Sequence, residues 1–223
     1  ADTSCDLPHM LPSPEKFAAR VRKLGLGDGN RIIVYDSQGM MSAARVWWEF
    51  RVFGHKDVAV LDGGLPKWLA EGRPLEDLPP MPRERHFTAR FDNSAVRDIV
   101  QMKENLKTGR EQVLDARSAG RFNGTEPEIW PGRRSGHIPG SLNLPYTDLL
   151  DPQLKTFLPA DHLLERFRAA GVDMTRPVVT TCGSGITACV LALALHLVGH
   201  KDVAVYDGSW AEWGRPGDTS VEP

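Results

Sequence analysis

The sequence predicts an α/β protein built from two related domains, each a parallel sheet flanked by helices. The first observation is a repeat, because residues 54–60 and residues 199–205 both read GHKDVAV. The second is its context, because each copy follows a β-branched run, a loop of small residues and an apolar segment of helical length. The third is that an Asp-Gly pair and then a tryptophan follow both copies at the same spacing. A duplicated domain explains all three observations.

The first half contains one strand–helix–strand unit. Ile32–Tyr35 is a β-branched run typical of a buried parallel strand. Ala43–Phe53 predicts a helix, and Gly54 stands where a helix often ends in a left-handed residue. Val58–Leu61 predicts the next strand. A strand, a helix and a second strand in this order favour parallel pairing through a right-handed crossover.

A polar stretch with four prolines, from Gly72 to Arg85, separates the halves and is typical of a linker. The second half then begins with a predicted strand near His86–Phe91 and a helix near Val96–Thr108. A third segment, Gln112–Ala116, predicts another strand. We expect these elements to extend the second sheet.

The second copy of the repeated unit follows the pattern of the first. Val178–Thr181 predicts a buried strand, and Thr187–Val198 predicts an apolar helix with Gly199 as its cap. Val203–Tyr206 predicts the closing strand. From these elements we expect an N-terminally incomplete first domain over residues 1–78, a linker and domain start over 79–91, and a second domain over 92–223.

Composition excludes several classes of function. Lys and Arg number 27 against 29 Asp and Glu, so a net charge of -2 gives no field that attracts nucleic acid or an acidic membrane. No apolar run reaches the roughly 20 residues that a membrane span needs. Three scattered cysteines favour neither a disulfide framework nor a metal site, and they indicate a reducing compartment, the cytoplasm. The chain begins with Ala1 rather than Met, so we expect that an N-terminal piece, including any targeting segment, is missing.

The two copies differ most in the loop between strand and helix. The second loop reads CGSGIT from Cys182, where the first copy has Asp36 or Ser37. Loops at the carboxyl ends of parallel strands are where α/β folds place their sites. Two glycines let the backbone turn around the sulfur, so that successive N–H groups form an anion-binding nest that favours thiolate over thiol. We therefore predict that Cys182 is the reactive residue, whereas Cys189 lies among apolar residues and is expected in the core.

Three motifs accompany the duplication: CGSGITA from Cys182, SGHIPGS from Ser135 and ARVWW from Ala44. Together they resemble the 3-mercaptopyruvate sulfurtransferases of the rhodanese superfamily, and the resemblance covers essentially the whole chain. It implies two rhodanese-like domains, of which the first is inactive and the second carries the cysteine that accepts sulfur as a persulfide. Asp36 in place of a thiol suits an inactive first copy.

The loop also indicates which donor the site prefers. Thiosulfate sulfurtransferases of the superfamily resemble CRKGVTA, whose Arg and Lys hold a dianion, whereas this loop has neutral Gly183 and Ser184. The missing charge favours the monoanion 3-mercaptopyruvate over thiosulfate. Related phosphatases use a C-x5-R loop, and this chain has Ala188 in place of that arginine. We therefore expect no phosphatase activity.

The resemblance also implies residues that hold the substrate. Arg121 matches a family arginine that binds the carboxylate and keto groups, a task that suits a planar guanidinium. A second family arginine lies nine residues further on, where this chain departs with Trp130. Arg133 and Arg134 lie just beyond, and either they reach the site or they are plain surface charges. His9 matches a family histidine at the domain interface and is expected to be a neighbour of the site.

The predicted reaction begins when the Cys182 thiolate attacks the sulfur of 3-mercaptopyruvate and pyruvate leaves. Ser184 acts as a second catalytic residue through a proton relay. A thiol, a thioredoxin-like protein or cyanide then accepts the sulfur, and no metal or organic cofactor is implied. The other predicted substrate-binding residues form the loop after the cysteine: Gly183, Gly185, Ile186 and Thr187.

Two other functions remain open from the sequence. The first is a thiosulfate:cyanide sulfurtransferase, which would use the same cysteine with another donor. The second belongs to a different class, a non-catalytic sulfur carrier or redox-sensing module that only holds the persulfide. The expected assembly is a monomer or a weak dimer.

Overall fold

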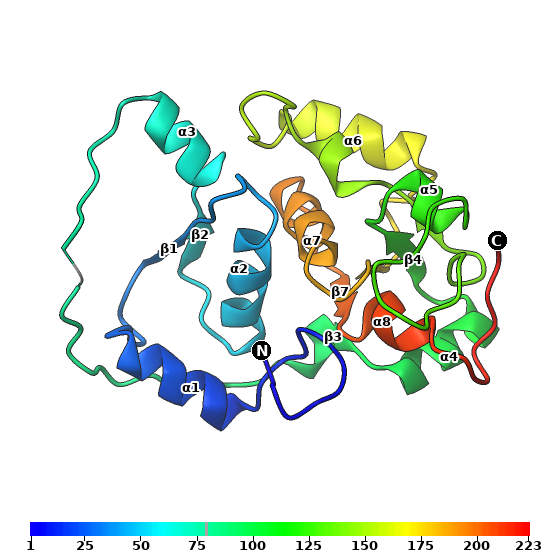
Figure 1. The fold of residues 1–223 in the computed structure, drawn as a ribbon, viewed down its shortest axis with the longest axis horizontal. Coiled ribbons are helices and arrows are strands. Elements are labelled where there is room, and N and C mark those ends of the chain that lie inside the picture. Colours follow the sequence, from blue (N-terminus) through cyan, green and yellow to red (C-terminus); the bar gives the residue numbers. More distant parts are fainter. Residues whose placement is uncertain (79) are drawn as a thin grey trace.

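The computed structural model describes residues 1–78 and 80–223, and it consists of two lobes that lie side by side (Figure 1). Position 79, where the predicted linker begins, lies outside the described residues. The first lobe has a two-stranded sheet, and the second has a five-stranded sheet. The predicted fold class, an α/β protein with two parallel sheets flanked by helices, is therefore confirmed.

The first lobe contains the predicted strand–helix–strand unit. Its strands pair in parallel, with Ile32 opposite Val58, and the helix between them ends before Gly54, whose φ is 88°. The elements of this lobe are α1 (Pro14–Lys23), β1 (Ile32–Val34), α2 (Ala43–Val52), β2 (Val58–Val60) and α3 (Gly64–Ala70).

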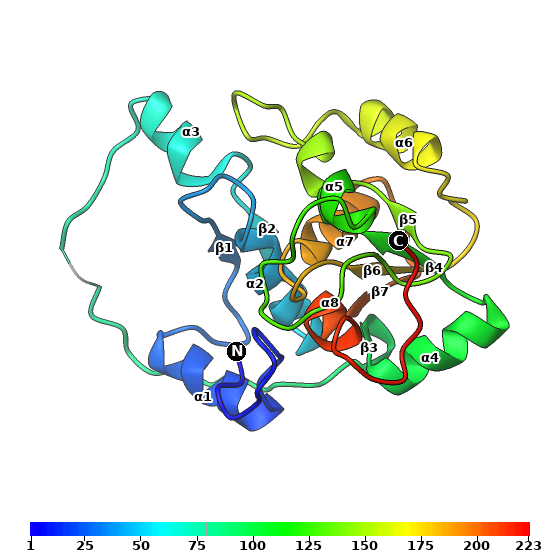
Figure 2. The same cartoon turned by 45° about the vertical axis from the view of Figure 1, so that its right-hand side comes forward.

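The second lobe is a parallel sheet with strand order β3-β7-β6-β4-β5, so β6 lies at its centre. Helices cover the sheet on both faces (Figure 2). The strands are β3 (Val96–Arg97), β4 (Gln112–Asp115), β5 (Leu142–Asn143), β6 (Val178–Thr181) and β7 (Val203–Tyr206). The helices are η1 (Asn93–Ala95), α4 (Ile99–Thr108), α5 (Ala119–Phe122), η2 (Tyr146–Leu149), α6 (Ala160–Ala169), α7 (Ala188–Leu197) and α8 (Ser209–Trp213).

The start of the second half differs from the prediction. The strand predicted near His86–Phe91 is wrong, because this segment packs against the first lobe and joins no sheet ladder: Phe87 is buried beside Phe17, and the Arg90 amide donates to the Phe53 carbonyl at 2.9 Å. The alternating apolar pattern there reflects burial without strand pairing. The strand of this region is β3, and α4 begins only after Asp98, which caps it together with the Gln101 side chain.

The repeated helices lie against each other at the centre of the molecule. α2 packs against α7, and one continuous hydrophobic core contains buried residues of both helices. The first residues of the chain, dark blue in Figure 2, lie between α1 and the second lobe. Two contacts tie them there, from the Leu11 amide to Asp207 and from Arg215 to Asp6. The lobes therefore pack against each other through both helices and through the first residues of the chain.

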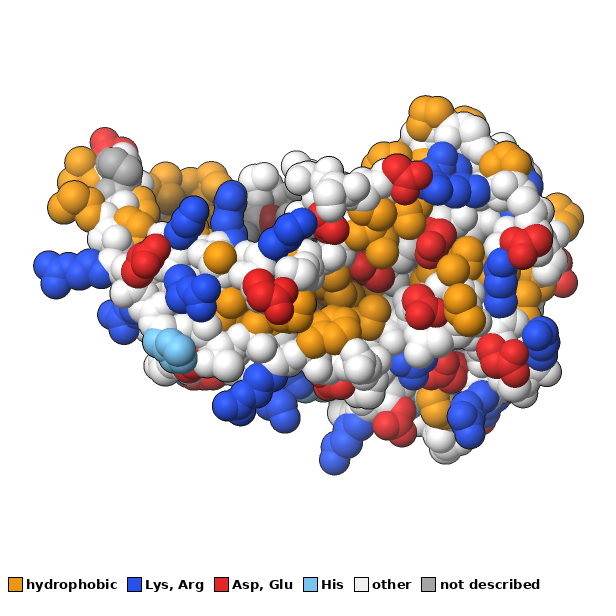
Figure 3. Space-filling view, turned by 90° about the horizontal axis from the view of Figure 1, so that it is seen from below, with side chains coloured by type: hydrophobic (Ala, Val, Ile, Leu, Met, Phe, Trp, Pro, Cys, Tyr) orange, Lys and Arg blue, Asp and Glu red, His pale blue; other side chains and the backbone are white. Residues whose placement is uncertain are grey.

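The surface carries charges of both signs. On the face shown in Figure 3, Lys and Arg side chains alternate with Asp and Glu, and apolar side chains gather near the middle. No helix among residues 1–78 and 80–223 is long and apolar enough to cross a membrane.

Candidate active site

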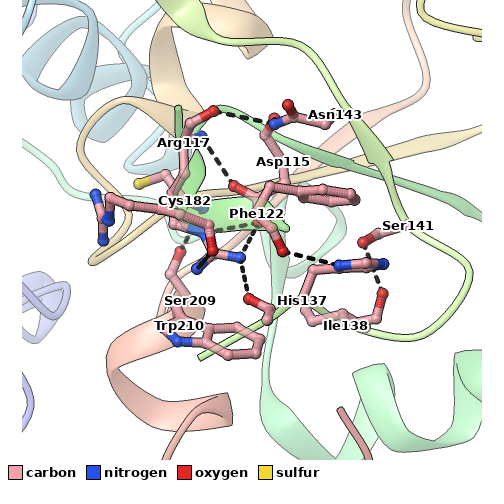
Figure 4. A network of polar contacts seen from close by, with 12 residues as sticks. Asp115, Arg117, Phe122, His137, Ile138, Ser141, Asn143, Cys182, Ser209 and Trp210 are labelled. Atoms are coloured by element: carbon pink, nitrogen blue, oxygen red, sulfur yellow. Dashed lines mark hydrogen bonds and ion pairs between the residues drawn. The ribbon is translucent and has the colours of Figure 1, made fainter. Parts of the chain in front are cut away.

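Cys182 directly follows β6, at the carboxyl end of the central strand of the larger sheet. The residue is almost fully buried, with 1% of its surface exposed. Its amide donates to the Ser209 Oγ at 3.2 Å, and its carbonyl accepts from the Trp210 amide at 2.9 Å. Figure 4 shows Cys182, Ser209 and Trp210 close together, with Arg117 beside them. The start of α8 therefore holds the cysteine backbone in place.

The loop after Cys182 presents a row of unused hydrogen-bond donors. The amides of residues 183–188 donate to no acceptor in the described parts of the chain. Gly185 has a φ of 78°, which turns the loop toward α7, and Ile186 and Thr187 complete it. Successive amides at a helix N-terminus create a positive potential that binds an anion. A thiolate or persulfide at Cys182 is such an anion.

The corresponding loop of the first lobe shows what such amides bind. Asp36 Oδ1 accepts from the amides of Gln38 and Gly39 at 2.8 and 2.7 Å. Its Oδ2 accepts from the amides of Ser42 and Ala43, both at 2.7 Å. Strand register and helix start place the equivalent amides of the second loop on Ser184, Gly185, Thr187 and Ala188.

Ser184 contacts a histidine from the first lobe. The Nδ1 of His9 lies 2.8 Å from the Ser184 Oγ, so the predicted site neighbour does reach the loop. Burial, followed by the nearby charge of Arg45, lowers the pKa of His9 below its ordinary value, although Asp207 opposes the shift. The ring is therefore neutral at neutral pH and can accept a proton from the Ser184 hydroxyl. The two side chains are therefore placed to form a proton relay, a role that the sequence assigned to Ser184 alone.

A buried ion pair between Arg45 and Asp207 holds the two lobes together behind this relay. Their Nη1 and Oδ1 atoms are 2.7 Å apart, and both side chains are nearly inaccessible. Arg45 also donates to the carbonyls of Gly185, at 3.2 Å, and His9, at 2.7 Å. Burial alone lowers the pKa of Arg45, but Asp207 and other anionic groups outweigh it and raise the pKa above its usual value. Arg45 thus positions both the loop and the histidine.

Sequence reasoning missed the role of this ion pair. Arg45 was noted only as part of the ARVWW motif and Asp207 only as part of the repeated Asp-Gly. The available signal was a charged residue inside an apolar helix, because such a residue is rarely buried without a partner. Nothing in the sequence identified that partner.

Arg121, the predicted substrate-binding residue, lies over the cysteine loop. A methyl group added to Gly183 would be 3.0 Å from Nη2 of Arg121. The same Nη2 donates to Glu128 Oε2 at 2.6 Å, whereas the buried Nε has no partner among the described residues. The guanidinium is therefore anchored on one side and available on the other.

Two carboxylates, Glu128 and Asp115, balance the charges of Arg121 and its neighbour Arg117. Glu128 also accepts from Arg117 Nη1 at 2.6 Å, and Arg117 Nε donates to Asp115 Oδ2 at 2.9 Å. Burial opposes the charge on Arg117, but these two carboxylates raise its pKa. In Figure 4 Arg117 lies beside Asp115 and over the Trp210 ring, whose centroid is 4.3 Å from the guanidinium carbon. Two arginines and two carboxylates thus form a rigid wall of the site.

Arg133 and Arg134 are both engaged by backbone carbonyls away from the loop amides. Arg134 donates to the carbonyls of Thr219 and Trp213 at 2.7 and 3.0 Å, and Arg133 donates to the Ala211 carbonyl at 2.7 Å. These contacts fasten the loop of residues 126–134 to α8 and the C-terminal segment. Of the two alternatives left open by the sequence, the structure shows neither a substrate contact nor a free surface charge, because both guanidinium groups are bound to the backbone.

His137 has a structural position. Its Nδ1 lies 2.9 Å from the Phe122 carbonyl, and its ring stacks on the Phe122 ring with centroids 3.7 Å apart (Figure 4). These two contacts hold the GHIPG turn against the end of α5. No group of three or more His, Cys, Asp or Glu side chains within residues 1–78 and 80–223 is arranged to hold a metal ion.

A cavity of about 600 Å³ lies elsewhere between the lobes. It is lined by residues such as Trp47, Trp48, Arg51 and Lys201, and none of the predicted site residues contributes to it. The cavity is therefore separate from the cysteine loop.

The chain is similar in sequence and fold to known proteins with rhodanese-like domains. A family model described as a rhodanese-like domain matches residues 5–71 and 98–215. The crystal structure of SseA, an Escherichia coli 3-mercaptopyruvate sulfotransferase, is similar with a TM-score of 0.84 and 39% identity, covering 95% of this chain and 79% of that one.

Curated relatives carry related names. The human 3-mercaptopyruvate sulfurtransferase is 44% identical over 100% of this chain and 76% of its own length. An Arabidopsis thaliana protein named thiosulfate/3-mercaptopyruvate sulfurtransferase 1, mitochondrial, is 41% identical over 100% of this chain and 64% of its own length. The chain thus spans about two thirds to three quarters of these relatives.

Proposed function

The chain belongs to the family of proteins with rhodanese-like domains, and we propose that it transfers sulfur from 3-mercaptopyruvate to Cys182 and then to an acceptor. One observation carries the proposal: the cysteine lies in a loop whose amides 183–188 have no acceptor in the described chain. The same loop in the first lobe surrounds a carboxylate. The second loop is therefore built to hold an anionic sulfur.

The proposed reaction balances without an external oxidant or reductant. The Cys182 thiolate attacks the substrate sulfur, forming the S–S bond, and the carbon–sulfur bond breaks with its electron pair on the departing enolate of pyruvate. The proton of the substrate thiol is transferred to the enolate carbon, so the products are pyruvate and the anionic persulfide of Cys182. The loop amides, which donate to no acceptor in the described chain, stabilise the persulfide as preorganised donors.

Neighbouring side chains bind the donor and move the proton. Arg121 is placed to bind the carboxylate and keto oxygens of the donor with the side of its guanidinium that Glu128 does not occupy. Ser184 passes the thiol proton through its hydroxyl, with neutral His9 as the temporary acceptor. Gly183 keeps the space under Arg121 free of a side chain.

In the second half-reaction an acceptor takes the outer sulfur and restores the thiolate. A small thiol, a thioredoxin-like protein and cyanide are the proposed acceptors, since each is a nucleophile able to attack the outer sulfur. With cyanide the products are thiocyanate and the Cys182 thiolate, so charge and atoms balance.

Thiosulfate is the alternative donor, and the name of the Arabidopsis relative includes both donors. The loop residues Gly183 and Ser184 bring no cation to the site, and Arg121 is already paired with Glu128. A dianion is therefore held less well than a monoanion. A non-catalytic sulfur carrier would use the same cysteine but would release no pyruvate in repeated cycles.

The test is a comparison of the wild-type protein with Cys182→Ser and Cys5→Ser variants. With 3-mercaptopyruvate, we expect wild type and Cys5→Ser to gain one sulfur atom in intact mass and to form pyruvate over many cycles when cyanide is present. Cys182→Ser should do neither. Pyruvate formation by Cys182→Ser would contradict the proposal, and a single uptake of sulfur without turnover would favour the carrier function.

Three further statements remain predictions. They are the inactive first domain over residues 1–78 with a catalytic domain over 92–223, the cytoplasmic location, and the monomeric or weakly dimeric state. Sedimentation over a range of protein concentrations tests the last of these.

A further inference from the structure

Trp130 has a buried polar atom that the fold does not satisfy. Its Nε1 is inaccessible and has no hydrogen-bond partner among residues 1–78 and 80–223. A buried indole N–H without an acceptor is destabilising, and tryptophan has no other polar atom that could compensate. A bound ligand with a hydrogen-bond acceptor would satisfy this N–H group.

The position of this nitrogen indicates where that acceptor binds. A methyl group added to Gly183 would lie 3.4 Å from Trp130 Nε1 and 3.0 Å from Arg121 Nη2. The indole and the guanidinium therefore face the same space beside the residue that follows Cys182. The Trp130 ring also lies edge-on to His9, with centroids 5.9 Å apart, which places it next to the proton relay.

The charge of this space is close to balanced. Arg121 is paired with Glu128, whose carboxylate also accepts from Arg117. Arg117 is itself paired with Asp115. The space thus offers several N–H donors but little net positive charge. Such a site binds a group with hydrogen-bond acceptors and one negative charge better than a compact dianion.

We propose that Trp130 is a specificity-determining residue, whose indole N–H donates to the carboxylate or keto oxygen of an α-keto thiol acid beside Arg121. This inference rests on the proposed function and deepens it. A neutral donor at this position strengthens binding of the monoanionic keto acid without adding the positive charge that thiosulfate needs. Trp130 touches the non-reacting end of the substrate, so it acts on binding more than on the chemical step.

The first test compares Trp130→Phe, which keeps the ring and removes the N–H, with Trp68→Phe as a matched control. Trp68 lies in α3, where its Nε1 donates to the Pro74 carbonyl. For Trp130→Phe we expect the KM for 3-mercaptopyruvate to rise about tenfold with kcat within about twofold, and the KM for thiosulfate to stay unchanged. Trp68→Phe should change neither donor's KM.

A second variant and a binding measurement keep the test decisive if Trp130→Phe does not fold. Trp130→Arg adds a cation and should raise the ratio of kcat/KM for thiosulfate to that for 3-mercaptopyruvate about tenfold. In the wild-type protein, the ¹⁵N–¹H indole signal of Trp130, assigned by its loss in either variant, should move when pyruvate is added.

An unchanged KM for 3-mercaptopyruvate in folded Trp130→Phe would overturn the inference. An indole signal whose chemical shift does not change when pyruvate is added would overturn it as well. These failures are distinct from failure of the proposed function. If the proposed function fails, the wild-type protein itself forms no pyruvate from 3-mercaptopyruvate. The indole signal then still reports whether Trp130 contacts a keto acid.

Discussion

The two strand-to-helix loops share one ancestral design but use it in opposite ways. In the first lobe, Asp36 places a carboxylate among four amides of its own loop, at distances of 2.7 to 2.8 Å. In the second lobe, the shorter loop, which begins at Cys182, leaves the equivalent amides without an acceptor in the described chain. The fold therefore supplies an anion-binding loop twice. In the proposed function, one side chain decides whether the loop amides are occupied by a carboxylate or remain available to a reacting group.

The helices that follow the loops differ in the same sense. Arg45 in α2 corresponds to Val190 in α7, by the common start of the two helices. Arg45 extends across the lobe interface to Asp207 and Gly185 and also donates to the His9 carbonyl within its own lobe, whereas Val190 is an ordinary core residue. The first lobe has thus kept the fold and supports the site of the second.

The comparison of the loops is tested most directly by Cys182→Asp, with Cys182→Asn as the isosteric neutral control. Both variants lack the nucleophile, so pyruvate formation should fall by at least about 10³-fold. The Asp variant should nevertheless have a free energy of unfolding about 1–3 kcal/mol larger than that of the Asn variant, because a carboxylate accepts the loop amides as Asp36 does. Urea denaturation at neutral pH measures the difference.

Equal stability of the Asp and Asn variants would show that the loop amides do not favour an anion. The account of persulfide stabilisation would then lose its basis, even with the activity gone in both proteins.

The complementary change is Asp36→Ala. It removes the acceptor of four amides and should lower the free energy of unfolding by about 2 kcal/mol, at the upper end of losses at helix caps. Asp36→Asn keeps one carbonyl oxygen and should lose less. Sulfur transfer by the folded variants should stay within a few-fold of wild type, since this loop takes no part in the chemistry. Thermal and urea unfolding measure the stability, and loss of activity in folded Asp36→Ala would contradict the assigned division of roles.

The smallest expected effect concerns His9, which the first lobe contributes to the second loop. Burial and then Arg45 lower its pKa from 6.5, so the ring stays neutral until the pH falls below that value. Protonated His9 cannot accept the Ser184 proton, so kcat/KM should drop on the acid side with a midpoint below 6.5. His9→Gln should lower kcat about tenfold and remove this acid limb. A pH profile that is the same in wild type and His9→Gln would exclude His9 from the relay.

Much of the fold followed from local patterns in the sequence. The strands over 32–35, 58–61, 112–116, 178–181 and 203–206 were predicted within one residue of the observed bounds, as were the two repeated helices. Local β-branched runs and apolar helical segments carry this information because they reflect what each element must bury. The strand predicted near His86–Phe91 was wrong for the same reason. Its apolar side chains alternate because they pack against the first lobe, and the segment pairs with no other strand.

The sequence by itself determined the two parallel sheets and the position of Cys182 at a strand end, because each rests on residues close together in the chain. It also determined the duplication, because residues 54–60 and 199–205 are identical and can be compared directly. It left Cys182 opposite either Asp36 or Ser37. Only the strand register, with Ile32 opposite Val58 and Val178 opposite Val203, decided for Asp36.

Tertiary structure alone also decided the long-range polar contacts: His9 with Ser184, Arg45 with Asp207, and the shared orientation of Arg121 and Trp130 over Gly183. These pairs are separated by up to 175 positions. A hydrogen bond depends on a distance of about 3 Å and on direction, and neither is encoded in the local periodicity of a chain. The packing of α2 against α7 brings Arg45 to the second lobe, where it meets Asp207 and Gly185.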